Sequence, residues 1–167
     1  ANLTAVYAIA RSLGIAPKRL APLFTGFKSL PHRNQIIGTI NGVKFVNDSK
    51  STNVASALYA LEMYDNIHWI AGGQPKDNNF SGISEKQANL KKAYLIGDAA
   101  HLIKRVLYET DTEVFNTLDE AFKRVLENIE DGDTVLLSPA CASFDQYLNF
   151  EVRGQHFIDL TNQFKNS

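Results

Sequence analysis

The chain has 167 residues, of which 44% are hydrophobic and 21% charged, with a formal net charge of −1. This length predicts one domain or slightly more, with a core that needs no disulfides. The charge balance does not indicate nucleic-acid binding, and no apolar run reaches the roughly 18 residues of a membrane-spanning helix. Cys141 is the only cysteine, which excludes a disulfide framework and favours a reducing cytoplasm.

The start of the chain lacks an initiator methionine and already follows a helical pattern at residues 3–13. A second short helix is expected at about 17–24, and the polar, proline-containing stretch 26–32 is typical of a linker. We therefore expect a piece of a longer protein, in which residues 1–27 are terminal helices and linker of a preceding domain. Residues 28–167 then form the main domain.

The main domain shows a regular alternation of elements. Runs 35–40 and 43–47 flank Asn41-Gly42, the favoured pair for a type I′ turn, which predicts a β-hairpin. Further strands are expected at about 67–71, 93–96, 113–115 and 134–137, and helices at about 53–63, 85–89, 99–108, 118–129 and 151–164. The last helix is expected to bury Val152, Phe157, Leu160 and Phe164. The pattern predicts an α/β fold: a Rossmann-like, mostly parallel sheet with helices on both faces, opened by the hairpin.

The stretch Asn47-Asp48-Ser49-Lys50-Ser51-Thr52-Asn53 lies between a strand and a helix. In a parallel sheet such turns form ligand sites, because the strand end and the free N–H groups of the helix face the same crevice. Helix capping by Ser51, Thr52 or Asn53 would be the purely structural explanation. Capping does not explain Asp48 and Lys50 beside Ser49.

Other unusual residues follow the later strands. Gly72-Gly73 is equally consistent with a simple tight turn, Asp98 is expected to cap the next helix, and Cys141 is expected to be a packed thiol. The four histidines lie on different elements, and satisfied or surface histidines are the default interpretation. There is no phosphate loop, dinucleotide fingerprint or nucleophile elbow, so we expect a binding domain whose chemistry is housed elsewhere.

The candidate site combines cations, hydroxyls, one carboxylate and aromatic walls. The residues are Arg33, Lys50, Lys76, Thr52, Ser143, Asp48, Phe144 and Phe150. Lysines and hydroxyls at strand and helix ends suit an anionic small molecule, and Asp48 suits a sugar hydroxyl or an amine.

An ordered set of motifs resembles the Mur ligases. It consists of Leu30-Pro31-His32-Arg33, Asn41-Gly42, the 47–53 stretch, Gly72-Gly73, the run Leu137 to Asp145, and Asn149-Phe150-Glu151-x-Arg153-Gly154. Within the family, the chain resembles the members that act on D-glutamate. The resemblance implies a three-domain, cytoplasmic, monomeric enzyme of peptidoglycan synthesis that uses ATP and Mg²⁺. Such an enzyme joins D-glutamate to UDP-N-acetylmuramoyl-L-alanine through an acyl phosphate.

The resemblance also implies roles for single residues. The central ATPase domain would hold the phosphate loop and the metal, leaving no catalytic residue and no metal ligand here, and only its last helices would be present. Adenine would contact Asn2, and the ribose and phosphates of ATP would contact Arg33, Asp48 and Lys50. D-Glutamate would contact Thr52, Lys76, Ser143, Phe150 and the backbone N–H of Phe144. Pro75 departs from the family, which commonly has an acidic residue before the lysine aligned with Lys76.

Two alternatives remain open at this point. One is a related amide ligase for another amino acid, and the other is a non-catalytic α/β nucleotide-binding or scaffold module.

Overall fold

The computed structural model describes residues 2–25 and 30–166, and of Asn2, Leu3 and Thr25 it describes the backbone alone. The chain divides into two compact units, Ala1–Leu30 and Pro31–Ser167. The predicted boundary after residue 27 falls outside the described residues.

The first unit is a pair of helices, α1 (Asn2–Ser12) and α2 (Pro17–Thr25). Gly14 ends α1 with a φ of +79°, and the N–H of Ile15 donates to the carbonyl of Ala10 across this end. Large apolar side chains remain exposed on this unit, namely Val6, Ile9, Leu13 and Leu23. None of the helices that the structure describes is long and apolar enough to cross a lipid bilayer.

The second unit opens with the predicted hairpin, β1 (Gln35–Ile40) and β2 (Val43–Asn47). The two strands pair antiparallel, with Ile40 opposite Val43. Asn41 and Gly42 have φ values of 50° and 79°. Two positive values in a two-residue loop are the signature of a type I′ turn, so this prediction is confirmed.

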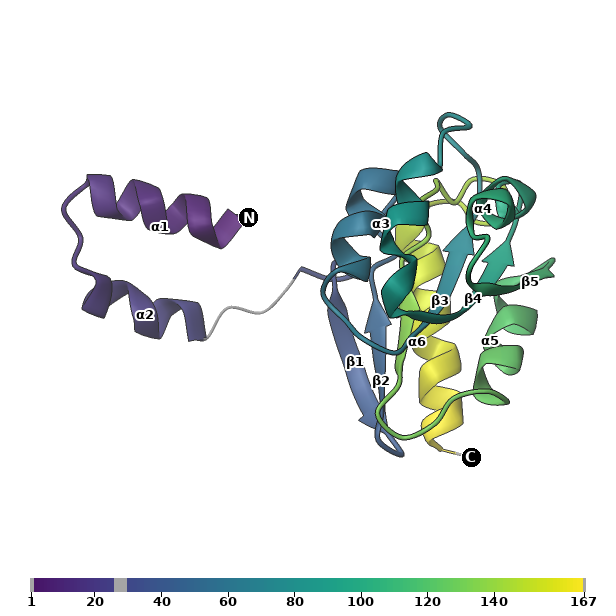
Figure 1. Cartoon of the computed structure of the whole chain (residues 1–167). Coiled ribbons are helices and arrows are strands. Elements are labelled where there is room, and N and C mark those ends of the chain that lie inside the picture. The colour runs from purple at the N-terminus through teal and green to yellow at the C-terminus, as the bar shows by residue number, and fades with distance from the viewer. Residues whose placement is uncertain (1, 26–29, 167) are drawn as a thin grey trace. The chain divides into compact units, whose positions relative to one another are not determined.

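The remaining elements alternate as the sequence predicts. They are α3 (Val54–Leu61), β3 (Ile67–Gly72), the 3₁₀ helix η1 (Ser81–Asn89), β4 (Leu90–Ile96), α4 (Ala100–Val106), β5 (Asp111–Phe115), α5 (Leu118–Leu126), β6 (Thr134–Leu137) and α6 (Phe150–Lys165). The sheet has the order β1-β2-β6-β3-β4-β5, and every neighbouring pair except β1 and β2 is parallel. The C-terminal helix α6 lies against this sheet (Figure 1).

The core consists of one layer on each face of the sheet. Successive side chains of a strand point to opposite faces, so Trp69 joins the layer under α3, η1 and α4, while its neighbour Ile70 joins the layer under α5 and α6. Burial of both faces explains why these strands are continuous apolar runs. The predicted α/β fold, with a mostly parallel sheet and helices on both faces, is confirmed.

Three local expectations are wrong. The helix expected at 85–89 is a 3₁₀ segment of residues 81–89 with a non-helical kink at Lys86. Asp98 does not cap α4, because Ala99 occupies the cap position without a side-chain hydrogen bond. Val152 is 44% exposed, since the inner face of α6 passes through Arg153, Phe157 and Thr161, and Val152 lies about 100° away from that face.

His68 is a satisfied core histidine, as expected. Its Nδ1 lies 2.9 Å from the Tyr94 hydroxyl and its Nε2 lies 3.0 Å from Asp133 Oδ2. Asp133 also accepts a hydrogen bond from Lys91 and from the N–H of Glu130. Burial lowers the pKa of His68 although Asp133 opposes the shift. This network ties β3, β4 and the start of β6 together.

Candidate functional site

The candidate site lies at the carboxyl ends of three adjacent strands. In the sheet, β6 lies between β2 and β3, so the segments that follow these strands, 48–53, 73–80 and 138–149, are neighbours. Two hydrogen bonds between Gln74 and Ala142, both 2.9 Å, join the β3 and β6 segments. The Ser138 hydroxyl joins the β6 segment to Asp48. The strand order therefore brings together loops that are far apart in the sequence.

Asp48 is a buried carboxylate held from two sides. Its Oδ1 accepts the N–H of Asn34 at 3.0 Å, and its Oδ2 accepts the Ser138 hydroxyl at 2.8 Å. Burial raises its pKa, while these hydrogen bonds and the nearby charge of Arg33 oppose the shift. A carboxylate has about four lone-pair sites, so acceptor capacity remains for a ligand hydroxyl.

We expect Asp48→Asn to raise the midpoint of thermal unfolding at pH 7. Because the folded-state pKa is raised, the favourable contribution of Asp48 is complete below its ordinary pKa of 3.8 and is lost as the pH rises through the folded-state value. The increase in the unfolding midpoint caused by Asp48→Asn should therefore shrink as the pH falls toward 3.8. Thermal melts at several pH values test this, with the exposed Asp65→Asn as the matched control. A lower midpoint for Asp48→Asn at pH 7 would contradict it.

Lys50 and Phe150 touch each other. The Lys50 ammonium lies over the Phe150 ring, 3.7 Å from its centroid, and the His32 ring packs edge-on against the same phenyl group. The Ser49 hydroxyl donates to the carbonyl of Phe150 at 2.8 Å. A residue predicted to face ATP and one predicted to face D-glutamate are therefore in direct contact, a relation that the sequence did not reveal.

Asn53 is the residue that caps α3. Its side chain accepts the N–H of Ser56 at 2.9 Å, while Ser51 is buried and Thr52 is half-buried. Capping therefore uses one residue of the 47–53 stretch. Asp48, Lys50 and Thr52 have no part in it, so their presence needs another explanation.

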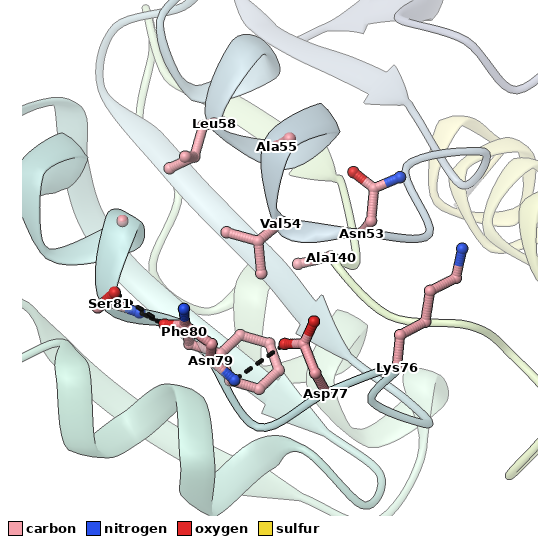
Figure 2. Close-up of a pocket in the computed structure, with 11 residues that line it drawn as sticks. Asn53, Val54, Ala55, Leu58, Lys76, Asp77, Asn79, Phe80, Ser81 and Ala140 are labelled. Atoms are coloured by element: carbon pink, nitrogen blue, oxygen red, sulfur yellow. Dashed lines mark hydrogen bonds between the residues drawn. The ribbon is translucent and has the colours of Figure 1, made fainter.

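Lys76 lies on an exposed loop at the edge of a hollow of about 460 Å³. Figure 2 shows its side chain extending toward Asn53 at the start of α3, with Val54 and Phe80 deeper in the hollow. The hollow thus has an apolar floor, and its edge carries both the Lys76 ammonium and the Asp77 carboxylate. A lysine in this position is available to an anion that approaches the N-terminus of α3.

Ser143 and Phe144 follow β6 on the loop that leads to α6. Ser143 is buried, and its carbonyl accepts the N–H groups of Gln146 at 3.1 Å and Tyr147 at 2.7 Å. The Phe144 side chain is 67% exposed. The predicted role of Phe144 belongs to its backbone N–H, which this exposure of the ring does not test.

Arg153 is the structural centre of the site, and the sequence reasoning gave it no role. It is 1% exposed and donates to both the hydroxyl and the carbonyl of Ser49, each at 3.0 Å, and to the carbonyls of Cys141 and Ala142 at 3.1 and 3.3 Å. Burial lowers its pKa to about 10. A sequence signal existed, because Arg153 and Phe157 are four residues apart and must share one helix face.

Asn47 is a second anchor that the sequence reasoning missed. Its amide nitrogen donates to the carbonyl of Gly154 at 3.1 Å and lies 3.0 Å from His32 Nδ1, while its oxygen accepts the N–H of Ser49. A Cβ on Gly154 would lie 2.3 Å from His32 Nδ1, so any larger residue there would displace the His32 ring.

The remaining predicted residues have different surroundings. Arg33 is exposed, and its positive charge reaches Asp48. Asn2 is the first residue of α1, and its side chain lies outside the described residues. Burial raises the pKa of Cys141 to about 12, which keeps it a packed thiol as expected. Within the part of the chain that the structure describes, no cluster of His, Cys, Asp or Glu is arranged to hold a metal ion.

A known protein family matches most of the second unit. The family model "Mur ligase, glutamate ligase domain" matches residues 32–141. This chain belongs to the Mur ligase family. The match includes Asp48, Lys50, Thr52 and Lys76 and ends just before Ser143.

Relatives of the Mur ligase family match almost the whole chain. A UDP-N-acetylmuramoylalanine–D-glutamate ligase from Dinoroseobacter shibae is 49% identical over 94% of this chain and 34% of that protein. A ligase of the same name from Rickettsia conorii is 39% identical over 95% of this chain and 33% of that protein. The chain thus spans about a third of the length of these relatives.

Solved structures share the fold at low identity. A UDP-N-acetylmuramate-alanine ligase from Thermotoga maritima matches with a TM-score of 0.67 and 18% identity over 98% of this chain and 37% of that one. A MurF ligase from the same organism, solved with ADP, matches with a TM-score of 0.63 and 18% identity over 99% of this chain and 38% of that one. These likenesses establish the fold of the family.

Proposed function

We propose that this chain is the C-terminal, D-glutamate-binding domain of the ATP-dependent ligase that adds D-glutamate to UDP-N-acetylmuramoyl-L-alanine in peptidoglycan synthesis. The observation that carries the proposal is the meeting of the segments after β2, β6 and β3, which places Thr52, Ser143 and Lys76 at one edge of the sheet. The names of the relatives that match nearly the whole chain support the same substrate. The proposed location is the cytoplasm, and the proposed state is a monomer.

The chemistry of the site suits a dicarboxylate amino acid. The Lys76 ammonium, the Thr52 and Ser143 hydroxyls and the Phe144 N–H are donors for two carboxylates, and Phe150 supplies an apolar wall. Each hydrogen bond to a charged group contributes roughly 1.5–3 kcal/mol. In this proposal the domain orients D-glutamate so that its amine faces the activated substrate, and it excludes water from that side.

The nucleotide would lie on the other side of the 47–53 stretch. Asp48 has free acceptor capacity for ribose hydroxyls, and Lys50 and Arg33 are cations suited to phosphates. Asn2, in the first unit, is proposed to contact adenine. ATP, when bound, supplies the phosphoryl group that activates the acceptor carboxylate.

The rest of the ligase is proposed to hold the phosphate loop and Mg²⁺. The first unit, with α1 and α2, is proposed to be the end of that central ATPase domain. Its exposed apolar side chains, Val6, Ile9, Leu13 and Leu23, support this, because such a surface favours burial against further protein.

Substitution of Lys76 in the ligase that contains this domain tests the proposal. We expect Lys76→Ala to raise the KM for D-glutamate roughly tenfold to a hundredfold, because one charge-assisted hydrogen bond is lost. The KM for ATP should change less than about twofold, since the nucleotide contacts other residues. Lys104→Ala, an exposed lysine on α4, is the matched control.

Three results would contradict the proposal. If Lys76→Ala changed the KM values for D-glutamate and ATP equally, Lys76 would not belong to the amino-acid pocket. If the wild-type ligase turned over another amino acid faster than D-glutamate, D-glutamate would not be its substrate. The isolated chain should neither hydrolyse ATP nor form the amide, and turnover by the chain alone would contradict the division of roles.

A further inference from the structure

A chain of three polar side chains holds the loop 143–149, which carries Ser143 and Phe144. Tyr147 projects from this loop, and its hydroxyl lies 2.9 Å from Nδ1 of His156 on α6. The other ring nitrogen of His156, Nε2, lies 3.2 Å from Oδ1 of Asp119 in the first turn of α5. The Tyr147 and His156 rings pack with their centroids 5.9 Å apart. The loop is thereby attached to two helices on one face of the sheet.

The three side chains are complementary as hydrogen-bond donors and acceptors. Burial, together with the negative charges of Asp119 and Asp145, raises the pKa of Tyr147 to about 12, and the cation of Arg153 opposes the shift. The hydroxyl therefore keeps its proton and can donate it to Nδ1 of His156. In the tautomer with its proton on Nε2, His156 donates to the Asp119 carboxylate.

Tyr147 is also joined directly to Ser143 through the backbone. The backbone N–H of Tyr147 donates to the Ser143 carbonyl at 2.7 Å, the shortest such contact in the loop. The Gln146 side chain donates a second hydrogen bond, to the carbonyl of Asn116 directly after β5, at 2.8 Å. On its other side Ser143 follows Ala142, which Gln74 and Arg153 hold. The Ser143–Phe144 segment is thus clamped at both ends.

We propose that Tyr147 and His156 are positioning residues for the amino-acid site, because they set where the Ser143 hydroxyl and the Phe144 N–H point. The inference rests on the proposed function, since it assigns those two groups to D-glutamate. The side chains of His156 and Asp119 are 32% and 59% exposed, so their hydrogen bonds add little to the stability of the fold. A displacement of about 1 Å in a binding loop, by contrast, is enough to weaken substrate binding.

Three variants separate positioning from packing. Tyr147→Phe keeps the ring and removes the hydroxyl, and His156→Ala removes the link to both partners. His156→Gln restores an acceptor and a donor at similar reach, so it should rescue the function. Tyr108→Phe, at a tyrosine that is 73% exposed, is the matched control for loss of a hydroxyl.

The first measurement needs no substrate. In ¹⁵N-labelled chain, we expect Tyr147→Phe and His156→Ala to move or broaden the amide signals of Ser143 and Phe144, while signals of β2 and β3 stay in place. His156→Gln and Tyr108→Phe should leave the wild-type pattern. Unchanged Ser143 and Phe144 signals in both disruptive variants would overturn the inference, whatever the ligand of the site is.

The second measurement uses the ligase that contains this domain. Tyr147→Phe and His156→Ala should raise the KM for D-glutamate about threefold to tenfold with the KM for ATP unchanged, as expected for a displaced hydrogen-bond partner. His156→Gln should restore the wild-type value. Moved amide signals with an unchanged KM for D-glutamate would overturn the positioning role. If the wild-type ligase does not use D-glutamate, the proposed function fails, and the amide signals still decide whether Tyr147 and His156 hold the loop.

Discussion

Replacing Arg153 by alanine is expected to lower the free energy of unfolding by about 3–5 kcal/mol, the range for truncating a large buried side chain that satisfies several polar groups. Four acceptors on Ser49, Cys141 and Ala142 would lose their donor at once. These acceptors are buried, so water would not replace the hydrogen bonds that they lose. The 47–53 and 138–149 segments should then separate, and site geometry should be lost together with stability.

Urea unfolding measures this effect through Trp69, the only tryptophan, which is fully buried in the sheet and donates to the carbonyl of Ser138. Arg105→Ala, an exposed arginine on α4, is the matched control and should change the free energy by no more than about 0.5 kcal/mol. The free energy of unfolding of Arg153→Lys should lie between those of Arg153→Ala and Arg105→Ala, because a lysine keeps the charge but offers fewer donors in a different geometry. A loss below about 1 kcal/mol for Arg153→Ala would contradict the central role of this residue.

Gly72→Ala is expected to lower the free energy of unfolding by at least about 3 kcal/mol, through backbone strain together with a clash. Gly72 ends β3 with a φ of +119°, a conformation that side chains rarely adopt, and a Cβ there would lie 1.9 Å from the carbonyl oxygen of Ile96. That oxygen belongs to the paired strand and also accepts the N–H of Gly73, so it has no room to move. The end of β3 would have to part from β4.

Gly38→Ala is the matched control, because Gly38 also lies in a strand, its φ is not positive, and nothing lies within 4 Å of an added Cβ. Its effect should stay within about 1 kcal/mol. In Gly72→Ala the Gln74 and Ala142 amides should also lose their hydrogen-bonded chemical shifts, since the bridge between them begins two residues later. Equal unfolding midpoints for the two variants would show that Gly72 is an ordinary turn glycine.

The glycine pair illustrates what local patterns leave open. From the sequence, Gly72-Gly73 is as consistent with a simple tight turn as with a part of the candidate site. The need for glycine at position 72 depends on which strand lies next to β3 and how far its carbonyls project. The same holds for Arg153, whose partner Ser49 is 104 residues away. No pattern within one helix could identify that partner.

The site residues divide in the same way. The 47–53 stretch and the segment 138–144 are recognisable from the sequence as unusual segments after apolar strands, and their position at one sheet edge follows from parallel pairing. Their contacts do not follow from it. The Lys50 ammonium over the Phe150 ring and the Asp48 carboxylate under Ser138 depend on β6 lying beside β2, and strand order is not written in hydrophobic periodicity.

The sequence by itself determined the α/β class, the hairpin at Asn41-Gly42 and the strand-to-helix turn that bears Asp48, Lys50 and Thr52. These depend on turn chemistry and side-chain periodicity, which act over a few residues. Only the tertiary structure decided that Asn53 is the cap, that Val152 faces outward, and that Arg153 joins the segments of the site. The physical reason is that burial and hydrogen-bond satisfaction are properties of the assembled sheet, in which residues distant in sequence compete for the same interior positions.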